Sequence, residues 1–593
     1  MLKNIISLFL LVSVALSSSF AAKKGAIVPR EKKHAAIENA AAAKMVAQTG
    51  LRKSSPNQGS PMDITWTLMD SMANVYGTSS PAINPLVYDP WSNSLAMIHR
   101  GHAGYSSSSG TMWYGYSLDE AATWSRSSQL NADIPTFGRY PSSTFSNPTH
   151  STNAGDMIYE YSYPQLNPSA FGYLAFGLDP FMAGTPFSTE WAGQNNYSSQ
   201  TWIAPSDDGQ TNLYFFAELG TDSIAFWRTV DQGGTWTEHH IFSTETGLTA
   251  IYDERIRCVG NTIHVELLCQ HTNTGGDAGP IVSALTKSTD NGETWSDIEV
   301  VDWRTIPALS VYDDWGTKDG RVSHDFIVDA NHHEHMFYSL QDTAGTAWDI
   351  VEVYRTATGW DASIIAPRTG SFKPGFAALT QSDNEIGVAI DKDGGFIALK
   401  WIDAPVEGDS VDTDIFMRCK RLSDNTWTPI MNVTQTQNPD GREMSTHIAP
   451  YLKKDGENLT AYLAKSEQLA AVVDDSLNDT QPCAIWAGKF TWMHIVGVVE
   501  RESGLPRQHA LYTNYPNPFN PATKISFDIA TPSNVSLKVY DITGQEVATL
   551  LSGYQQAGKF EVAFNASGLS SGVYFYTLQA GEFSATQKML LSK

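Results

Sequence analysis

The chain of 593 residues contains few cysteines and few charged side chains. Its four cysteines are too few to cross-link a protein of this length extensively, although export would permit disulfides. Cys258 and Cys269 lie two residues before and eight residues after the expected turn at Gly260-Asn261, so a simple cross-strand bridge between them is not expected. We predict that Cys258, Cys269, Cys419 and Cys483 are buried free thiols.

Long apolar runs are almost absent. The exception covers residues 5–16, follows Lys3 and precedes a stretch of small residues, which is the layout of a secretory signal peptide. A run of this length is shorter than the ~20 residues that a membrane-spanning helix needs. Ser19 and Ala21 fit the small-x-small cleavage pattern, so we predict a signal peptide over 1–21 and no transmembrane segment in the mature chain.

Positive charge is scarce and unevenly distributed. The chain has 39 Lys and Arg against 63 Asp and Glu, and eight of the basic residues lie within 22–60. We interpret residues 22–60 as a basic leader or linker. Because the remaining 61–593 hold 30 basic against 61 acidic residues, they would repel phosphates, which excludes nucleic acid as an expected partner.

Aromatic residues and glycine, in contrast, are plentiful: 17 Trp, 24 Tyr, 25 Phe and 45 Gly. This composition favours many short strands joined by turns over long helices. A chain of this length also exceeds one ordinary hydrophobic core, so two or more domains are expected.

One pattern occurs seven times in the middle of the chain. Each copy is an apolar strand, a short turn rich in Asp, Asn and Gly, and a second apolar strand, which is the signature of a β-hairpin. The copies are centred near residues 91, 155, 208, 260, 331, 393 and 456. This spacing predicts seven four-stranded sheets.

A second repeat runs in phase with the hairpins. Residues 229–236 and 288–295 read Thr-Val-Asp-Gln-Gly-Gly-Thr-Trp and Ser-Thr-Asp-Asn-Gly-Glu-Thr-Trp, while 117–124 is a variant with Ala121 where Gly is expected. These segments resemble the Asp-box of sialidase-type (BNR-like) β-propellers, and segments ending at Trp360 and Trp427 look like eroded copies. In such a turn the Asp accepts backbone N–H groups, Gly permits a positive φ, and Trp packs between sheets.

The two repeats together predict an all-β fold with a β-propeller over 61–500, with seven blades favoured and six possible. A string of β-sandwiches is the alternative, but each sandwich needs ~100 residues, and the repeat here is shorter. Residues 501–513 are expected to be a linker.

The last 80 residues, 514–593, carry the most specific sequence in the chain. Asn-Tyr-Pro-Asn-Pro-Phe-Asn-Pro at 514–521 precedes alternating strands, among them 535–540 and 573–578, which predict a small Ig-like β-sandwich. These motifs resemble the type A C-terminal sorting domain of the type IX secretion system. The resemblance implies export by that machinery, removal of the tail and a secreted or outer-membrane surface location. A fibronectin-like adhesion module is the alternative.

Ionisable residues cluster where the innermost strand of several blades is expected to begin. Converging Arg, His and Asp side chains at a channel mouth could bind a carboxylate or sulfate, or perform acid–base chemistry. The alternative is that they link neighbouring blades. The candidate ligand-binding residues are His150, Asp253, Arg255, Arg321, His324, Asp325, Arg442 and His447.

Sialidases require three arginines, a Tyr nucleophile activated by Glu, and an acid/base Asp. The string from Arg304 to Pro307 only approximates the Arg-Ile-Pro signature of that family and follows the third Asp-box instead of preceding the first. We therefore assign no catalytic residue. We expect an exported propeller that binds an extracellular glycan or protein. The alternatives are a sialidase-like glycoside hydrolase or a lyase acting at the channel mouth, and a structural component of the cell envelope.

Two further segments look like metal sites. His332, His333 and His335 occupy a predicted polar turn, where alternation sends His333 and His335 to one face and His332 away from it. Residues 391–394 look like a calcium loop but lack its later ligands. We interpret both as solvated turns and expect neither a metal nor a cofactor.

Overall fold

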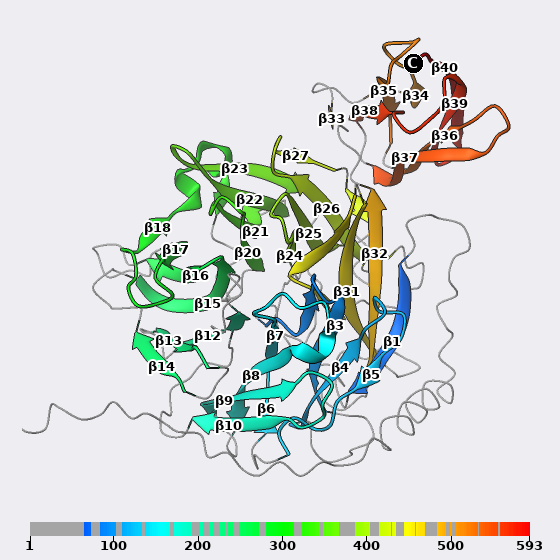
Figure 1. Ribbon diagram of the computed structural model, residues 1–593. Helices are drawn as coiled ribbons and strands as arrows, with labels where there is room; N and C mark the ends of the chain where they lie inside the picture. The colour runs from blue at the N-terminus through cyan, green and yellow to red at the C-terminus, as the bar shows by residue number, and fades with distance from the viewer. Residues whose placement is uncertain are drawn as a thin grey trace, which may run out of the picture.

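The computed structural model describes residues 64–72, 83–101, 110–132, 137–166, 171–191, 202–205, 213–218, 224–231, 235–240, 248–271, 280–313, 323–343, 348–366, 386–403, 414–428, 430–434, 444–456, 458–468, 483–493, 499–500, 506, 508–531, 533–555 and 558–593. The predicted signal peptide and basic leader lie outside these residues. The strands of the body surround a common centre, and a smaller domain at the C-terminus lies beside this ring (Figure 1).

The described strands of the body sort into seven antiparallel sets, numbered here as blades 1 to 7 in chain order. Blade 1 contains β2 (Leu86–Asp89), β3 (Ser94–Arg100), β4 (Met112–Ser117) and β5 (Ser125–Arg126). Blade 2 contains β6 (Phe137–Gly138), β7 (Ser142–Ser146), β8 (Ile158–Leu166), β9 (Phe171–Pro180) and β10 (Phe187–Trp191). Blade 3 contains β11 (Trp202–Pro205), β12 (Leu213–Glu218), β13 (Ile224–Thr229) and β14 (Thr237–His240).

Blade 4 contains β15 (Leu248–Val259), β16 (Thr262–His271), β17 (Ile281–Ser288) and β18 (Glu299–Val301). Blade 5 contains β19 (Tyr312–Asp313), β20 (His324–Val328), β21 (Glu334–Asp342), β22 (Trp348–Thr356) and β23 (Gly359–Ala366). Blade 6 contains β24 (Gly387–Asp391), β25 (Phe396–Asp403), β26 (Asp414–Arg421), β27 (Thr426–Trp427) and β28 (Met431–Asn432). Blade 7 contains β29 (Met444–Ile448), β30 (Tyr451–Asp455), β31 (Asn458–Gln468), β32 (Cys483–Met493) and, from the other end of the body, β1 (Thr65–Met72).

The innermost strands form a closed ring. β2, β7, β11, β15, β20, β24 and β30 contact one another in this order, and β30 contacts β2 again. Each of the seven predicted hairpins supplies an innermost strand and the strand that follows it. Blades 6 and 7 share one parallel pairing between β24 and β30, at Ile390 and Tyr451, so these two blades form one continuous sheet. The propeller prediction is confirmed, and the described innermost strands number seven, the count that the hairpins favoured.

The first described strand closes this ring. β1 pairs antiparallel with β32 from Thr65 to Met72, so the N-terminal end of the body forms the outer strand of the last blade. Met69 and Met72 of β1 are buried in a core that also contains residues of blade 1. Between blades 1 and 7, Glu120 accepts hydrogen bonds from Lys453 and Lys489.

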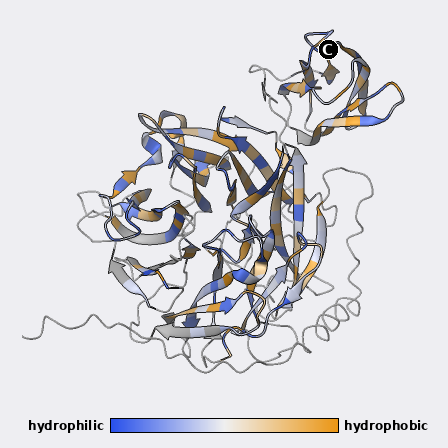
Figure 2. Ribbon diagram, viewed as in Figure 1, coloured by the Kyte–Doolittle hydropathy of each residue, from blue (hydrophilic) through white to orange (hydrophobic). Residues whose placement is uncertain are grey.

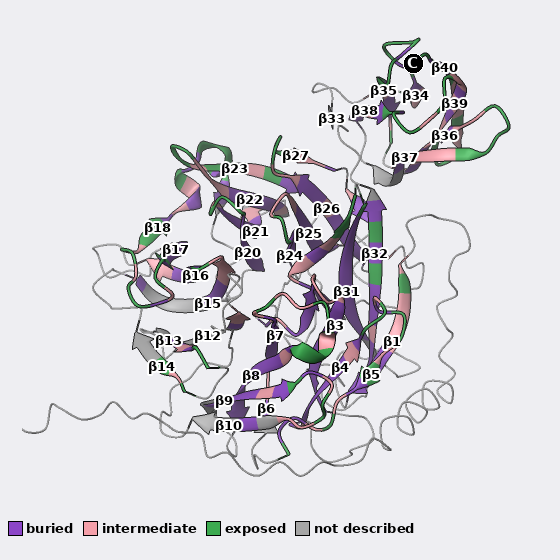
Figure 3. Cartoon of the chain, viewed as in Figure 1, coloured by how far each residue is buried: buried purple, intermediate pink, exposed green. Residues whose placement is uncertain are grey.

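Asp-box tryptophans of blades 3, 4 and 6 each contact an aromatic ring of the blade before. The ring of Trp236 in blade 3 lies edge-on to Phe176 in blade 2, with centroids 4.7 Å apart. Trp295 of blade 4 contacts Phe226 of blade 3 in the same way at 5.0 Å. Even the eroded copy in blade 6 keeps an edge-on contact to blade 5. Figure 2 shows apolar residues along the strands, and Figure 3 shows that the strands are mostly buried.

The Asp-box turns have the predicted hydrogen bonds. Asp290 accepts bonds from the Ser288 hydroxyl and from both the backbone N–H and the hydroxyl of Thr294, and these bonds lower the pKa of Asp290 to about 2. Gly292 has φ 86° and Ala121, at the equivalent position, has φ 67°. Ala121 therefore adopts the left-handed conformation that Gly would tolerate with less strain.

The C-terminal domain is the predicted two-sheet sandwich. One sheet contains β33 (Val499–Glu500), β34 (Ala510–Leu511), β35 (Ala522–Ile529) and β38 (Gly558–Asn565). The other contains β36 (Ser533–Tyr540), β37 (Glu546–Gln555), β39 (Gly572–Ala580) and β40 (Phe583–Leu591). Its buried apolar cluster lies entirely between Leu511 and Leu591 and is separate from the cores of the propeller.

All four cysteines are free thiols: Cys269, Cys419 and Cys483 are buried, and Cys258 is half-buried. Within the described ranges, no helix has both the length and the apolar character needed to cross a bilayer.

Closure by β1 leads to a first prediction. We compare two chains without the leader, one beginning at residue 64 and the other at residue 73, which lacks β1. Loss of this strand exposes the edge of β32 and part of the core, so we expect the unfolding midpoint to fall by roughly 5 °C or more, from a loss of a few kcal/mol. Circular dichroism during heating measures the midpoint, and equal midpoints would contradict a closing role for β1.

Candidate functional site

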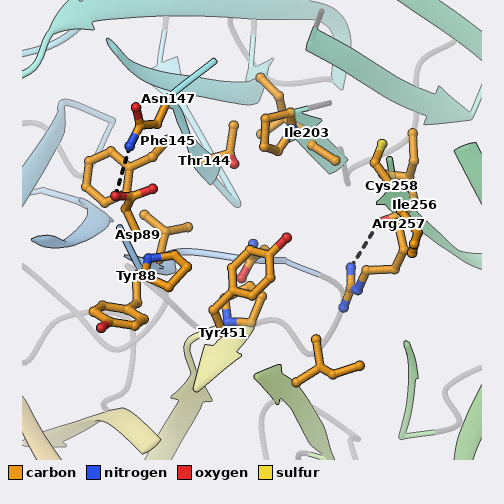
Figure 4. A pocket seen from close by; sticks show the side chains of 18 of the residues that line it. Tyr88, Asp89, Thr144, Phe145, Asn147, Ile203, Ile256, Arg257, Cys258 and Tyr451 are labelled. Carbon is orange, nitrogen blue, oxygen red and sulfur yellow. Dashed lines mark hydrogen bonds between the residues drawn. The ribbon is translucent and has the colours of Figure 1, made fainter. Parts of the chain in front are cut away.

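A pocket lies where the innermost strands lead into their hairpin turns, and all seven blades contribute to its wall. It encloses about 910 Å³, including the part open to solvent. Figure 4 shows Asp89 and Asn147 on one side, Arg257 on the opposite side, and Tyr451 between them.

Aromatic rings form one part of the wall. The rings of Trp91 and His150 stack with their centroids 4.0 Å apart and an interplanar angle of 2°. Tyr451 lies edge-on to Trp91 at 6.5 Å. His150 has φ 51°, a conformation that turns the chain after β7. Three rings from blades 1, 2 and 7 therefore meet in the pocket.

Polar groups fill the neighbouring part of the wall. One carboxylate oxygen of Asp89 accepts hydrogen bonds from the backbone N–H of Ser92 at 2.7 Å and from the amide of Asn147 at 3.1 Å. Burial raises the pKa of Asp89, although these hydrogen bonds oppose the shift. Across the pocket, Arg257 donates a hydrogen bond to Asp325 at 3.2 Å. The pocket thus combines aromatic surface with acceptors on one side and a guanidinium on the other.

Four of the sequence-predicted site residues come together, but inside the wall between blades. Arg255 pairs with Asp253 at 2.5 Å and with Asp325 at 3.4 Å, and it donates to the carbonyl of His324 at 3.2 Å. The Arg255 side chain is 1% exposed. Asp325 also accepts the backbone N–H of Val388 at 2.9 Å, so the cluster joins blades 4, 5 and 6.

His324 extends this cluster away from the channel. Its imidazole lies 3.4 Å from Asp253 and 3.0 Å from Glu266. Glu266 accepts a hydrogen bond from Ser283, whose hydroxyl also contacts Tyr338 at 2.6 Å. The geometry of these residues matches the inter-blade linking role that the sequence left open as the alternative.

The other predicted residues are dispersed. His150 lines the pocket, but it follows the innermost strand β7 instead of preceding it. His447 is buried on β29, where it pairs in register with Ala464. Arg321 and Arg442 lie outside the described residues. Arg304 forms a two-point contact with Asp302, at 2.7 and 2.9 Å, and does not line the pocket.

The two suspected metal segments have the geometry of turns. His333 and His335 both face Asp329, at 3.2 and 4.0 Å, and His332 points away from it, as the alternation predicted. Asp391 accepts the backbone N–H groups of Gly395 and Phe396 at 2.7 and 2.6 Å.

Sequence reasoning missed most of the pocket. Asp89 and Trp91 lie at the first hairpin turn, which was interpreted only as a connection, and Tyr451 is the first residue of the innermost strand β30. The segments Tyr-Asp-Pro-Trp at 88–91 and Pro-Tyr at 450–451 combine rigid proline with aromatic rings. Large aromatics beside proline, in an inner turn or at an end of an innermost strand, are the signal that could have indicated this end of the channel.

The fold and its tail define an exported β-propeller protein. Residues 513–592 match the family described as the secretion system C-terminal sorting domain. The protein is therefore secreted or displayed at the cell surface. No curated protein matches the chain.

Solved structures give only distant similarities. PorZ, an essential surface component of the type IX secretion system of Porphyromonas gingivalis, is 12% identical with a TM-score of 0.36, and the alignment covers 87% of this chain and 60% of PorZ. An α-L-arabinofuranosidase of Fusarium graminearum is 11% identical with a TM-score of 0.32, over 71% of this chain and 98% of the enzyme. A leech intramolecular trans-sialidase is 11% identical with a TM-score of 0.33, over 71% and 70%. These scores are too low to support inferences about this chain.

A buried carboxyl group lies beside the pocket wall. Glu160 on β8 pairs in register with the pocket residue Thr144. Glu160 is 0% exposed, and neither of its carboxyl oxygens has a hydrogen-bond partner. Burial raises the pKa of Glu160 from 4.5 to about 8. The side chain is therefore protonated at neutral pH in the folded protein.

This pKa leads to a second prediction, for Glu160→Gln. Between pH 4.5 and 8 the folded protein holds one proton that the unfolded chain has lost, so rising pH reduces stability by at most about 1.4 kcal/mol per unit. Because Gln cannot ionise, the Glu160→Gln variant does not lose stability in this way as the pH rises. Denaturant unfolding should show a stability gain for Glu160→Gln over the parent that is larger at pH 8 than at pH 5. The exposed control Glu582→Gln should show no such difference, and an equal gain at both pH values for Glu160→Gln would contradict the proton linkage.

Proposed function

We propose that this protein is an exported glycan-binding β-propeller that holds its ligand in the pocket at the hairpin end of the channel. The observation that carries the proposal is the meeting of Trp91, His150 and Tyr451 with Asp89, Asn147 and Arg257 in one pocket. Sugar rings present apolar C–H faces that pack on aromatic rings, and hydroxyl groups that both donate and accept hydrogen bonds. This pocket provides both kinds of partner.

The charges of the pocket favour a neutral glycan over an acidic one. Arg257 is the only arginine among the described residues that line it, and Arg257 already pairs with Asp325. Recognition of a sialic acid carboxylate would need uncompensated guanidinium groups, as in the three-arginine clamp of sialidases. Asp89 further disfavours an anion at the opposite wall.

Binding is favoured over hydrolysis by the number of carboxyl groups. Glycosidases ordinarily place two carboxyl groups on either side of the scissile bond. Asp89 is the single acidic residue among the described residues that line the pocket. Glycoside hydrolysis would need a second carboxyl group opposite Asp89. Hydrolysis therefore stays the alternative.

The third prediction tests the aromatic wall with Trp91→Ala in the mature chain. An array of neutral, sialylated and sulfated glycans identifies a ligand for the parent, and calorimetry measures its affinity. We expect a neutral glycan, and we expect Trp91→Ala to weaken its binding at least tenfold, or about 1.4 kcal/mol, because the stacking surface is lost.

Trp360→Ala is the matched control, since Trp360 lies on the outer strand β23 and stacks on Arg355 away from the pocket. It should bind like the parent. Unchanged affinity in Trp91→Ala, or equal loss in both variants, would overturn the pocket as the binding site.

A fourth prediction concerns the tail. Deleting residues 513–593 removes every residue of the second core except Leu511 and removes no residue of the propeller cores. We expect the truncated protein to remain inside the cell envelope and to bind the same glycan with unchanged affinity. Fractionation with immunoblotting follows its location, and full-length Trp91→Ala, which should be exported like the parent, is the control. Surface delivery of the truncated chain would contradict dependence on the tail.

A further inference from the structure

Two histidines from different blades face each other across the boundary between blades 4 and 5. His264 lies on β16, and His332 lies in the turn between β20 and β21. Nε2 of His264 is 3.3 Å from Nδ1 of His332, and the two rings are stacked at 19°. The two residues are separated by 68 positions in the chain, so only the fold brings them together.

A chain of charged groups fixes the ring of His264. Its Nδ1 lies 3.2 Å from Glu334, which also accepts a hydrogen bond from Arg355. Arg355 in turn pairs with Glu299 at 2.7 Å. Glu334 thus lies between the guanidinium of Arg355 and the imidazole of His264. With the proton of His264 on Nδ1, facing the carboxylate, Nε2 accepts the hydrogen bond from Nδ1 of His332, and a bound metal ion would take the place of that proton.

The hydrogen bonds of the turn between β20 and β21 hold His332 in the position that faces His264. Asp329 accepts the backbone N–H groups of Asn331 and His333 at 2.7 and 2.9 Å, and His332 adopts φ 62°. His332 is exposed, whereas His264 is buried. Partial desolvation, together with repulsion from His264 and Lys287, lowers the pKa of His332.

We propose that His264 and His332 form a binding site for a borderline divalent transition-metal ion such as Zn²⁺ or Cu²⁺. Imidazole nitrogens bind Zn²⁺ at ~2.0–2.1 Å, so two nitrogens of one tetrahedral ion lie roughly 3.3 Å apart, the separation found here. Glu334 acts as the carboxylate that orients a metal-ligating histidine from behind. Water, or a group on an extracellular molecule, completes the coordination on the exposed side of His332.

The proposed site has two protein ligands, and this number limits its affinity for the metal ion. Among the described residues there is no cluster of three or more His, Cys, Asp or Glu arranged to hold a metal. His333 and His335 face Asp329 and are not ligands. An open site of this kind binds a metal more weakly than a closed structural zinc site. Lys287, which repels positive charge at His332, weakens it further.

The test uses the mature, tag-free chain after removal of bound metal with a chelator. One equivalent of Cu²⁺ is added at pH 7.5, and electron paramagnetic resonance counts the coordinating nitrogens, while calorimetry with Zn²⁺ measures affinity. We expect coordination by two imidazoles in the parent. His332→Ala, at an exposed position, should lose one nitrogen and at least tenfold in Zn²⁺ affinity, and Lys287→Met should bind more tightly than the parent.

His333→Ala is the matched control, because it removes the neighbouring histidine of the same turn and should leave both measurements unchanged. Binding should also weaken below about pH 6, as protons compete for the imidazoles. The proposal is overturned if His332→Ala binds as tightly as the parent, or if His333→Ala weakens binding equally. A parent spectrum without two imidazole nitrogens would also overturn it.

Discussion

Closure of the ring by β1 is the constraint on which the rest of the structure depends. A four-stranded antiparallel sheet cannot bury both faces alone, so each blade needs a neighbour on either side. The pairing of β1 with β32 supplies the outer strand of the last blade from the first described segment of the chain. The contact between β30 and β2 then brings residues near 89 beside residues near 451. The pocket is formed from both and exists only in the closed ring.

Polar groups between blades fix how the closed ring is oriented. Burying a charged side chain costs free energy unless an opposite charge and hydrogen bonds compensate it. Apolar side chains at the same boundary between blades would avoid this cost. In the cluster of Arg255, Asp253, His324 and Asp325, each ionisable group lies within 3.4 Å of a group of the opposite type, and the cluster contacts three blades. Glu352 accepts bonds from His335 and from Lys420, at 2.7 Å each, and joins blade 5 to blade 6 in the same manner. We infer that these contacts specify blade geometry more than they add stability.

The sequence predicts the architecture well because each repeat is locally encoded. Hairpin turns, Asp-box bonds and the Trp contacts all depend on residues close together in the chain, as in 288–295. The face to which a side chain points is harder to predict, because one β-bulge or register shift in a strand sends the following side chains to the opposite face. β15 contains register shifts between Thr249 and Asp253, and β29 has one between Met444 and His447. The positions of Asp253 and His447 relative to the channel therefore could not be read from alternation.

The direction of the innermost strands also explains why both candidate sites lie at one end of the ring. β15 and β20 each end in the pocket wall, at Val259 and Val328, and each leads directly into its hairpin turn. His264 follows the first of these turns and His332 lies within the second. The short hairpin turns after β15 and β20 therefore place the proposed metal ligands His264 and His332 close to the residues that line the pocket. A ligand that reaches the pocket enters at this end of the ring, so an ion at His332 would add positive charge near an opening whose described lining carries one acidic residue, Asp89.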